Sequence, residues 1–167
     1  GAAMNGCSAV HLSIFGMEPV RRHGSPELAA EVLPRVAAGD LHVAFGVTEP
    51  DAGTDTTSIR TRAVRDGDEY VVHGAKVWTT KAPLSEMCLL LVRTTPREEC
   101  AKPTDGMTLL LVDLQRPEVD IRPIPKLGRN APAHQPTGGG GADDIHLVIH
   151  RCGNGRMVEG NAEFLRM

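Results

Sequence analysis

Short apolar runs separated by turn-forming residues fill the middle of the chain and limit its possible folds more than any other feature. Runs at residues 41–48, 87–92 and 107–112 are each bounded by charged residues, proline or glycine. Their length and aliphatic composition are typical of buried β-strands. Because aromatic residues make up only 3% of the chain, a β-domain here must build its core from valine, leucine, isoleucine and alanine.

A hairpin and an edge strand complete the predicted β-domain. Residues 59–64 alternate between polar and apolar, Asp66-Gly67 is a strong hairpin turn, and residues 69–78 form the returning strand. Residues 118–124 predict a last strand whose prolines limit further pairing. We expect a small antiparallel β-barrel preceded by helices, because closure of the sheet removes exposed strand edges.

The first 39 residues predict helices instead of strands. Residues 25–27 (Ser-Pro-Glu) supply an N-cap, a proline at the first helical position and a carboxylate near the helix N-terminus. We expect Pro34 to break this helix, with a short further turn reaching Gly39. A two-helix fragment cannot form a core alone, so it must pack on the β-domain or on helices outside the chain. The apolar residues that share one helix face are Leu28, Val32 and Leu33.

Composition and charge exclude several classes of protein. The net charge of −3 and the pI near 6.2 give no basic surface for nucleic acid. No window approaches the roughly 20 apolar residues that a membrane span requires. The cysteines are scattered without a Cys-x-x-Cys pair, which predicts reduced thiols and a cytoplasmic location rather than disulfides or a zinc site. They are Cys7, Cys88, Cys100 and Cys152.

Two segments of the β-region suggest a ligand pocket. Phe45-Gly-Val-Thr-Glu-Pro-Asp-Ala-Gly-Thr-Asp55 ends an apolar run with turn formers and short hydroxyl residues. Lys76-Val-Trp-Thr-Thr80 places the only tryptophan of the chain beside two threonines. Backbone amides, hydroxyls and one flat ring would suit a planar cofactor with polar edges. The plain alternative is a strand exit shaped by turn residues, with Trp78 as an anchor of the core.

These segments carry a resemblance to a known family. Phe-x-Val-Thr-Glu-Pro-x-Ala-Gly-Thr-Asp, followed by Gly-Asp-Glu-Tyr-Val-Val-x-Gly-x-Lys-Val-Trp-Thr-Thr, is similar to the middle β-domain of the acyl-CoA dehydrogenases, which are FAD flavoproteins. The resemblance keeps one register from about Gly1 to Asn130, so it is far more specific than a short motif. It implies that residues 1–39 end a helical domain and that residues 40–130 form the middle β-barrel domain.

The resemblance also implies roles for individual residues. Gly53 and Thr54 are expected near the bound thioester substrate. Trp78 is expected to shield one side of the flavin, and the Thr80 hydroxyl to form a hydrogen bond with flavin N5. The implied cofactor-binding residues are Phe45, Val47, Thr48, Trp78, Thr79 and Thr80.

The reaction implied by the resemblance is the α,β-dehydrogenation of an acyl-CoA thioester, as in fatty-acid β-oxidation. A base removes the α-proton while the β-hydrogen passes as hydride to FAD, and an electron-transferring flavoprotein is the expected acceptor. In the family this base belongs to a C-terminal helical domain, so no residue here is named as catalytic. Glu49 and Asp55 are expected to cap loop amides instead. A complete protein of this kind is expected to be a homo-oligomer.

Two other functions stay open at this point. One is a flavin oxidase or monooxygenase on the same scaffold, acting on substrates that are not CoA thioesters. The other is a catalytically inert fragment that serves only as a structural or binding module.

Residues 131–167 match the family poorly, and we treat them as an aberrant tail. Gly138-Gly-Gly-Gly141 lacks the Gly-Lys-Ser/Thr ending of a phosphate-binding loop and is interpreted as a linker. His146 and His150 are four residues apart, but Val148-Ile149 between them predicts a strand, so no metal site is expected. We hypothesise that the tail is partly the product of a shifted reading frame, which the DNA of a close relative would reveal.

Overall fold

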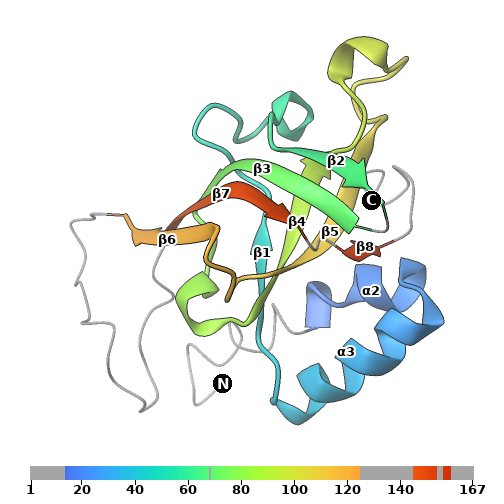
Figure 1. Cartoon of the computed structure of the whole chain (residues 1–167), viewed down its shortest axis with the longest axis vertical. Helices are drawn as coiled ribbons and strands as arrows, with labels where there is room; N and C mark the ends of the chain where they lie inside the picture. The colour runs from blue at the N-terminus through green and yellow to red at the C-terminus, as the bar shows by residue number, and fades with distance from the viewer. Residues whose placement is uncertain (1–13, 68, 125–144, 154–155, 159–167) are drawn as a thin grey trace.

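The computed structural model describes residues 14–67, 69–124, 145–153 and 156–158, the last two ranges by their backbone. Helices come first and strands follow (Figure 1). The helices and strands are α2 (Glu18–His23), α3 (Pro26–Ala38), β1 (Val43–Gly46), β2 (Arg62–Asp66), β3 (Glu69–Val77), β4 (Met87–Arg93), β5 (Met107–Asp113), β6 (Val119–Pro123), β7 (Ile145–Gly153) and β8 (Arg156–Val158).

The strands form one open sheet in two halves. Its order is β6-β7-β3-β2-β4-β5-β8, and β1 pairs in parallel with β4 outside this path. The halves join where β2 meets β4, a ladder in which Arg62 pairs with Arg93. In the other ladders of this path neighbouring strands are antiparallel.

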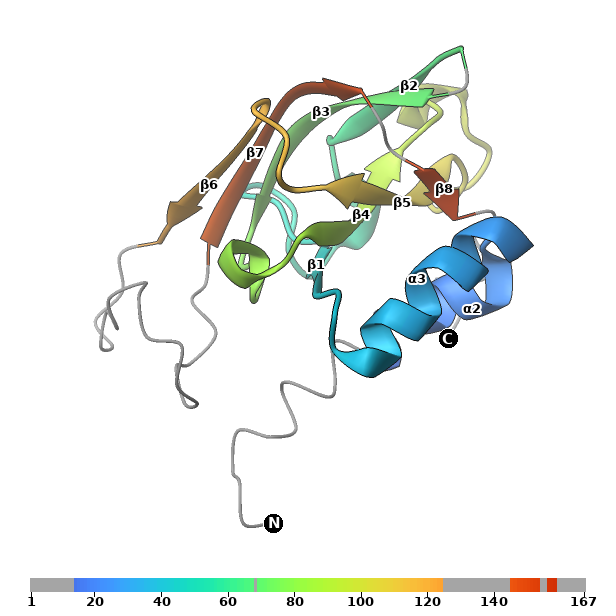
Figure 2. The ribbon, with the colours of Figure 1, turned by 60° about the horizontal axis from the view of Figure 1, so that its bottom comes forward.

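The prediction of a closed barrel is wrong. The path of described strands ends at β6 and at β8, which do not pair with each other. The sheet does not close on itself. Instead, a layer packs against each apolar face of β4 and β5. One face of β4 and β5 packs on the helices, through Leu89 and Leu111, and the other packs on the β2–β3 half, through Leu90 and Leu110. Figure 2 shows α2 and α3 beside β5 and β8, on the side away from β3 and β7.

Helix α3 runs through Pro34, so the expected break is also wrong. The helix begins as predicted, with the Ser25 hydroxyl accepting a hydrogen bond from the Leu28 amide at 3.2 Å, and it ends at Gly39 with φ +83°. Pro34 and Ala30 both face solvent, so water can satisfy the Ala30 carbonyl that lacks a helical donor. The opposite face buries Leu28, Val32 and Val36 against the sheet.

The predicted strands are otherwise found close to their expected positions. The turn between β2 and β3 uses Gly67 with φ +63°, which a residue with a side chain adopts only at a cost. Strand β7 confirms the strand expected at residues 148–149, and it lies between β3 and β6. The hypothesis of a shifted reading frame and the domain boundaries stay predictions.

Among the described residues, no helix has the length and apolar character needed to cross a membrane.

We expect Cys88, near the start of β4, to resist alkylation. The thiol is 0% exposed, and burial raises the pKa of Cys88 to about 12. Because the thiolate is the reactive form, iodoacetamide at about pH 8 should label the half-buried Cys100 well before Cys88. Peptide mapping by mass spectrometry measures both rates, and the denatured protein serves as the control. Equal labelling of the two residues in the folded protein would contradict the burial of Cys88.

Candidate cofactor site

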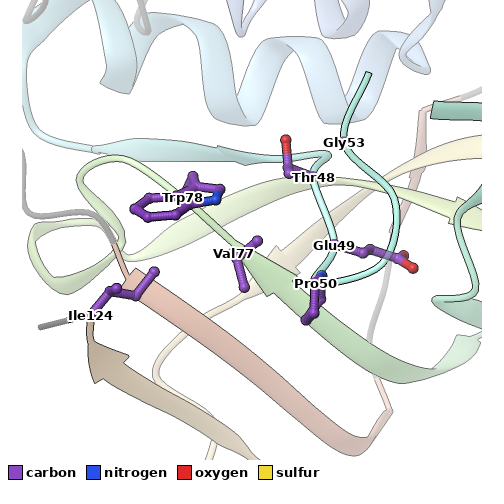
Figure 3. A pocket seen from close by; sticks show the side chains of 7 residues that line it. All are labelled: Thr48, Glu49, Pro50, Gly53, Val77, Trp78 and Ile124. Atoms are coloured by element: carbon purple, nitrogen blue, oxygen red, sulfur yellow. The ribbon is translucent and has the colours of Figure 1, made fainter. Parts of the chain in front are cut away.

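Segments distant in the sequence meet around one pocket of about 510 Å³. The segment after β1, the end of β3 and the residue after β6 supply its walls. Figure 3 shows the ring of Trp78 beside the segment that carries Thr48, with the Thr48 oxygen pointing away from Val77. The lining residues are Thr48, Glu49, Pro50, Gly53, Val77, Trp78 and Ile124.

Backbone hydrogen bonds set the shape of the pocket walls. The Val77 amide donates to the Thr48 carbonyl at 2.9 Å, which joins the end of β3 to the segment after β1. Glu49 and Ala52 exchange two backbone hydrogen bonds, of 2.9 and 3.2 Å, and close a tight loop around Pro50. Backbone hydrogen bonds therefore hold the segment after β1 against the end of β3 at the pocket.

Asp55 confirms its predicted role as a cap of loop amides. Its carboxylate accepts hydrogen bonds from the Thr57 amide at 3.0 Å and the Thr57 hydroxyl at 2.6 Å, and also from the Ser58 hydroxyl. The hydrogen bonds from Ser58 and Thr57 hold the pKa of Asp55 below its ordinary value. The carboxylate is thus committed to the short helical turn Thr56–Ser58 and not to the pocket.

Trp78 is both exposed and conformationally strained. Its φ is +60°, a region that costs an L-residue about 1–2 kcal/mol, and the residue is 54% exposed. The alternative that Trp78 anchors the core is therefore wrong. Strained backbone of this kind persists where the surrounding structure enforces it, often at ligand-binding positions.

Glu49, which lines the pocket, forms a buried ion pair with Lys76, which does not, with 2.9 Å between Oε1 and Nζ. Burial alone would raise the pKa of Glu49, but hydrogen bonds from Thr61 and Arg60 and the charge of Lys76 hold it below its ordinary value. Burial lowers the pKa of Lys76, and Glu49 opposes this shift. Glu49 confirms the prediction that it caps loop amides, since Arg60 and Thr61 donate their amides to it.

The structure separates the predicted site residues into two groups. Thr48, Gly53 and Trp78 line the pocket. The other predicted residues do not belong to its lining: Phe45 and Val47 pack against the core on the helix side, Thr54 is exposed, Thr80 is half-buried and Thr79 is fully buried. The Thr79 hydroxyl has no hydrogen-bond partner among the described residues.

Sequence reasoning missed Val77 and Ile124 in the lining and the burial of Lys76. The burial of Lys76 could have been predicted from the two-residue period of a β-strand. Residues 72, 74 and 76 share one face of β3, and Val72 on that face is apolar. No local sequence pattern predicts Ile124 in the pocket lining, because its position depends on how β6 pairs with β7.

Comparisons with known proteins agree on one family. The family model described as acyl-CoA dehydrogenase, middle domain, matches residues 44–137. Acyl-CoA dehydrogenase FadE26 of Mycobacterium tuberculosis is 44% identical over 112 residues, which cover 66% of this chain and 28% of that protein. Acyl-CoA dehydrogenase IpdE1 of the same organism is 36% identical over 135 residues, covering 81% of this chain and 34% of the relative.

Solved structures show the same relationship. A probable acyl-CoA dehydrogenase from Mycobacterium abscessus superimposes with a TM-score of 0.77 and 28% identity, covering 98% of this chain and 42% of that chain. A glutaryl-CoA dehydrogenase from Mycobacterium smegmatis in complex with FADH2 gives a TM-score of 0.67 and 28% identity, covering 86% of this chain and 33% of that one. The matched part of the chain thus spans between 28% and 42% of the length of these relatives.

Proposed function

Because the chain belongs to the acyl-CoA dehydrogenase family, whose members bind FAD, we propose that it forms the flavin-facing wall of an acyl-CoA dehydrogenase. The observation that supports this proposal is that Thr48 and the exposed, strained Trp78 line the same pocket. The pocket joins the two segments that carry the family resemblance.

The residues around the pocket fit a flavin. The Trp78 ring offers an exposed flat face, and the Thr48 hydroxyl can donate or accept a hydrogen bond at a polar ring edge. A Cβ built on Gly53 would meet no atom within 4 Å, so this wall leaves open space for a ligand. The volume of about 510 Å³ lies within the range of small-molecule sites.

In this proposal the chain binds and orients the flavin ring of FAD, and other parts of the enzyme complete the site. FAD, when bound, supplies the hydride chemistry of the α,β-dehydrogenation. Trp78 would exclude water from one side of the ring, while Thr48 and nearby amides would hold its edge. We assign the catalytic base and the acyl-chain pocket to the remaining length that the relatives have. An acyl-CoA substrate, an electron-transferring flavoprotein as acceptor and neighbouring subunits are the partners we propose.

Titration with FAD tests the proposal, and Trp78 is its own reporter because the chain has one tryptophan. We expect FAD to quench the Trp78 fluorescence until a binding plateau is reached. Replacing Trp78 with alanine should weaken FAD binding about two- to tenfold, since a stacked aromatic ring contributes about 0.5–1.5 kcal/mol. Calorimetry measures both affinities.

The control for this titration is Val64→Ala, which removes an exposed apolar side chain on β2 that does not line the pocket. It should bind FAD as the wild type does. If FAD produces neither saturable quenching nor heat, the proposal fails and the inert fragment is the better description of this chain.

A further inference from the structure

The buried ion pair at the pocket holds three segments together. Lys76 on β3 is 1% exposed, and its ammonium donates to Glu49 Oε1 and to the Val47 carbonyl, both at 2.9 Å. Glu49 is 6% exposed, and its two oxygens also accept the amide of Arg60 at 2.6 Å and the amide of Thr61 at 2.9 Å. These hydrogen bonds link the segment after β1 and the entry to β2 with the end of β3.

Both partners are adjacent to residues that line the pocket. Glu49, itself in the lining, follows Thr48, and Lys76 precedes Val77 and Trp78. The bond from Lys76 to the Val47 carbonyl fixes the peptide immediately before Thr48. Thr48 and Trp78 are therefore held by one buried network, although 29 residues separate the Lys76 donor from its carbonyl acceptor along the chain.

The aliphatic stem of the Lys76 side chain lies beside Gly46 of β1. A Cβ built on Gly46 would lie 2.7 Å from Leu90 Cδ2 and 3.5 Å from Lys76 Cγ. The added Cβ would therefore be at an ordinary van der Waals distance from Lys76 and would clash only with Leu90. Beyond this point the ammonium reaches the Val47 carbonyl and Glu49.

Stability alone is a weak explanation for such a pair. Two charges lose their hydration on burial, and well-packed apolar residues of similar volume often stabilise a fold as much or more. A buried charged network is satisfied in one arrangement of its members, because every other arrangement leaves a charge or a carbonyl without a partner. The network therefore favours one relative position of the segments that it joins.

We propose that Glu49 and Lys76 are positioning residues that hold Thr48 and Trp78 in the arrangement that binds FAD. This inference rests on the proposed function, since the pocket of Thr48 and Trp78 is the proposed FAD site. Lys76 acts through the backbone of Val47 and through Glu49, and it does not itself line the pocket.

Two substitutions test the proposal, Glu49→Gln and Lys76→Met. Each removes one charge at similar side-chain size, and each should weaken FAD binding about tenfold or more, the usual weight of a hydrogen bond to a charged group. Without FAD, each should also reduce the near-ultraviolet circular dichroism of Trp78, while the far-ultraviolet spectrum stays that of the folded protein. If Lys76→Met does not fold, the more conservative Glu49→Gln decides the question.

The matched control is Asp51→Asn, in the same loop as Glu49. Asp51 and Arg60 form an exposed pair at 3.7 Å, with side chains 75% and 82% exposed, and such pairs contribute little. This variant should keep both the FAD affinity and the Trp78 signal of the wild type.

A purely structural role predicts another pattern of results. The proposal is overturned if Glu49→Gln and Lys76→Met unfold at lower temperature yet keep wild-type FAD affinity and Trp78 signal below that temperature. If the wild type does not bind FAD, the proposed function fails. The near-ultraviolet circular dichroism of Trp78, measured without FAD, then still tests whether Glu49 and Lys76 position the pocket walls. A reduced signal in both variants then supports positioning of the pocket walls by the pair, and an unchanged signal refutes it.

Discussion

Replacing Leu90 with alanine should lower the free energy of unfolding by about 2–5 kcal/mol, as is usual for large cavities in a core. Leu90 lies in the middle of β4, is 0% exposed and faces the core between the two sheet halves. It pairs with Leu110 across the ladder and packs against Gly46 of β1, so no neighbour is free to fill the space. Urea unfolding followed by circular dichroism measures the change.

Leu84→Ala is the matched control for Leu90→Ala. Leu84 is the same residue type, but it is 71% exposed on the loop after β3, so its removal should change the free energy of unfolding by less than about 0.5 kcal/mol. If the two variants were equally stable, the assignment of Leu90 to a tightly packed core would be wrong.

Gly74→Ala should be the second severe change, with a loss of about 3 kcal/mol in the free energy of unfolding. A Cβ at this position would lie 2.5 Å from Thr61 Oγ1 and 2.7 Å from Thr61 Cα, and a backbone atom cannot move aside as a side-chain end can. Gly74 also lies where the register between β3 and β7 shifts. Thermal and urea unfolding both measure the effect.

Gly67→Ala separates steric clash from backbone strain in this prediction. Gly67 has φ +63°, but a Cβ there would have nothing within 4 Å, so only the strain of about 1–2 kcal/mol should appear. A Gly74→Ala variant as stable as Gly67→Ala would show that β3 can move away from Thr61.

The clash in the Gly74→Ala variant should also affect the candidate site. The Thr61 amide donates to Glu49 Oε1, so a displaced Thr61 disturbs the network at the pocket. Weaker FAD binding by the folded fraction of Gly74→Ala would agree with the role we infer for Glu49.

Much of the candidate site could be predicted from the sequence because its two segments carry local signals. The segment from Phe45 to Asp55 and the segment around Trp78 were both expected at a cofactor, and Thr48, Gly53 and Trp78 do meet at one pocket. Which side chains face that pocket was not predictable, because a strand exit can turn either face inward. Phe45 and Val47 pack toward the helices for this reason.

Local sequence patterns were sufficient to predict the individual elements. The Asp66-Gly67 turn, the N-cap at Ser25 and the apolar runs of β4 and β5 depend on neighbours within a few residues, so their patterns predict them directly. The pairing of these elements could not be predicted in this way. The parallel pairing of β1 with β4, the open ends at β6 and β8 and the course of α3 through Pro34 depend on contacts between distant residues. The Glu49–Lys76 pair is of the same kind: no local pattern identifies the partner of a buried lysine, because packing selects it.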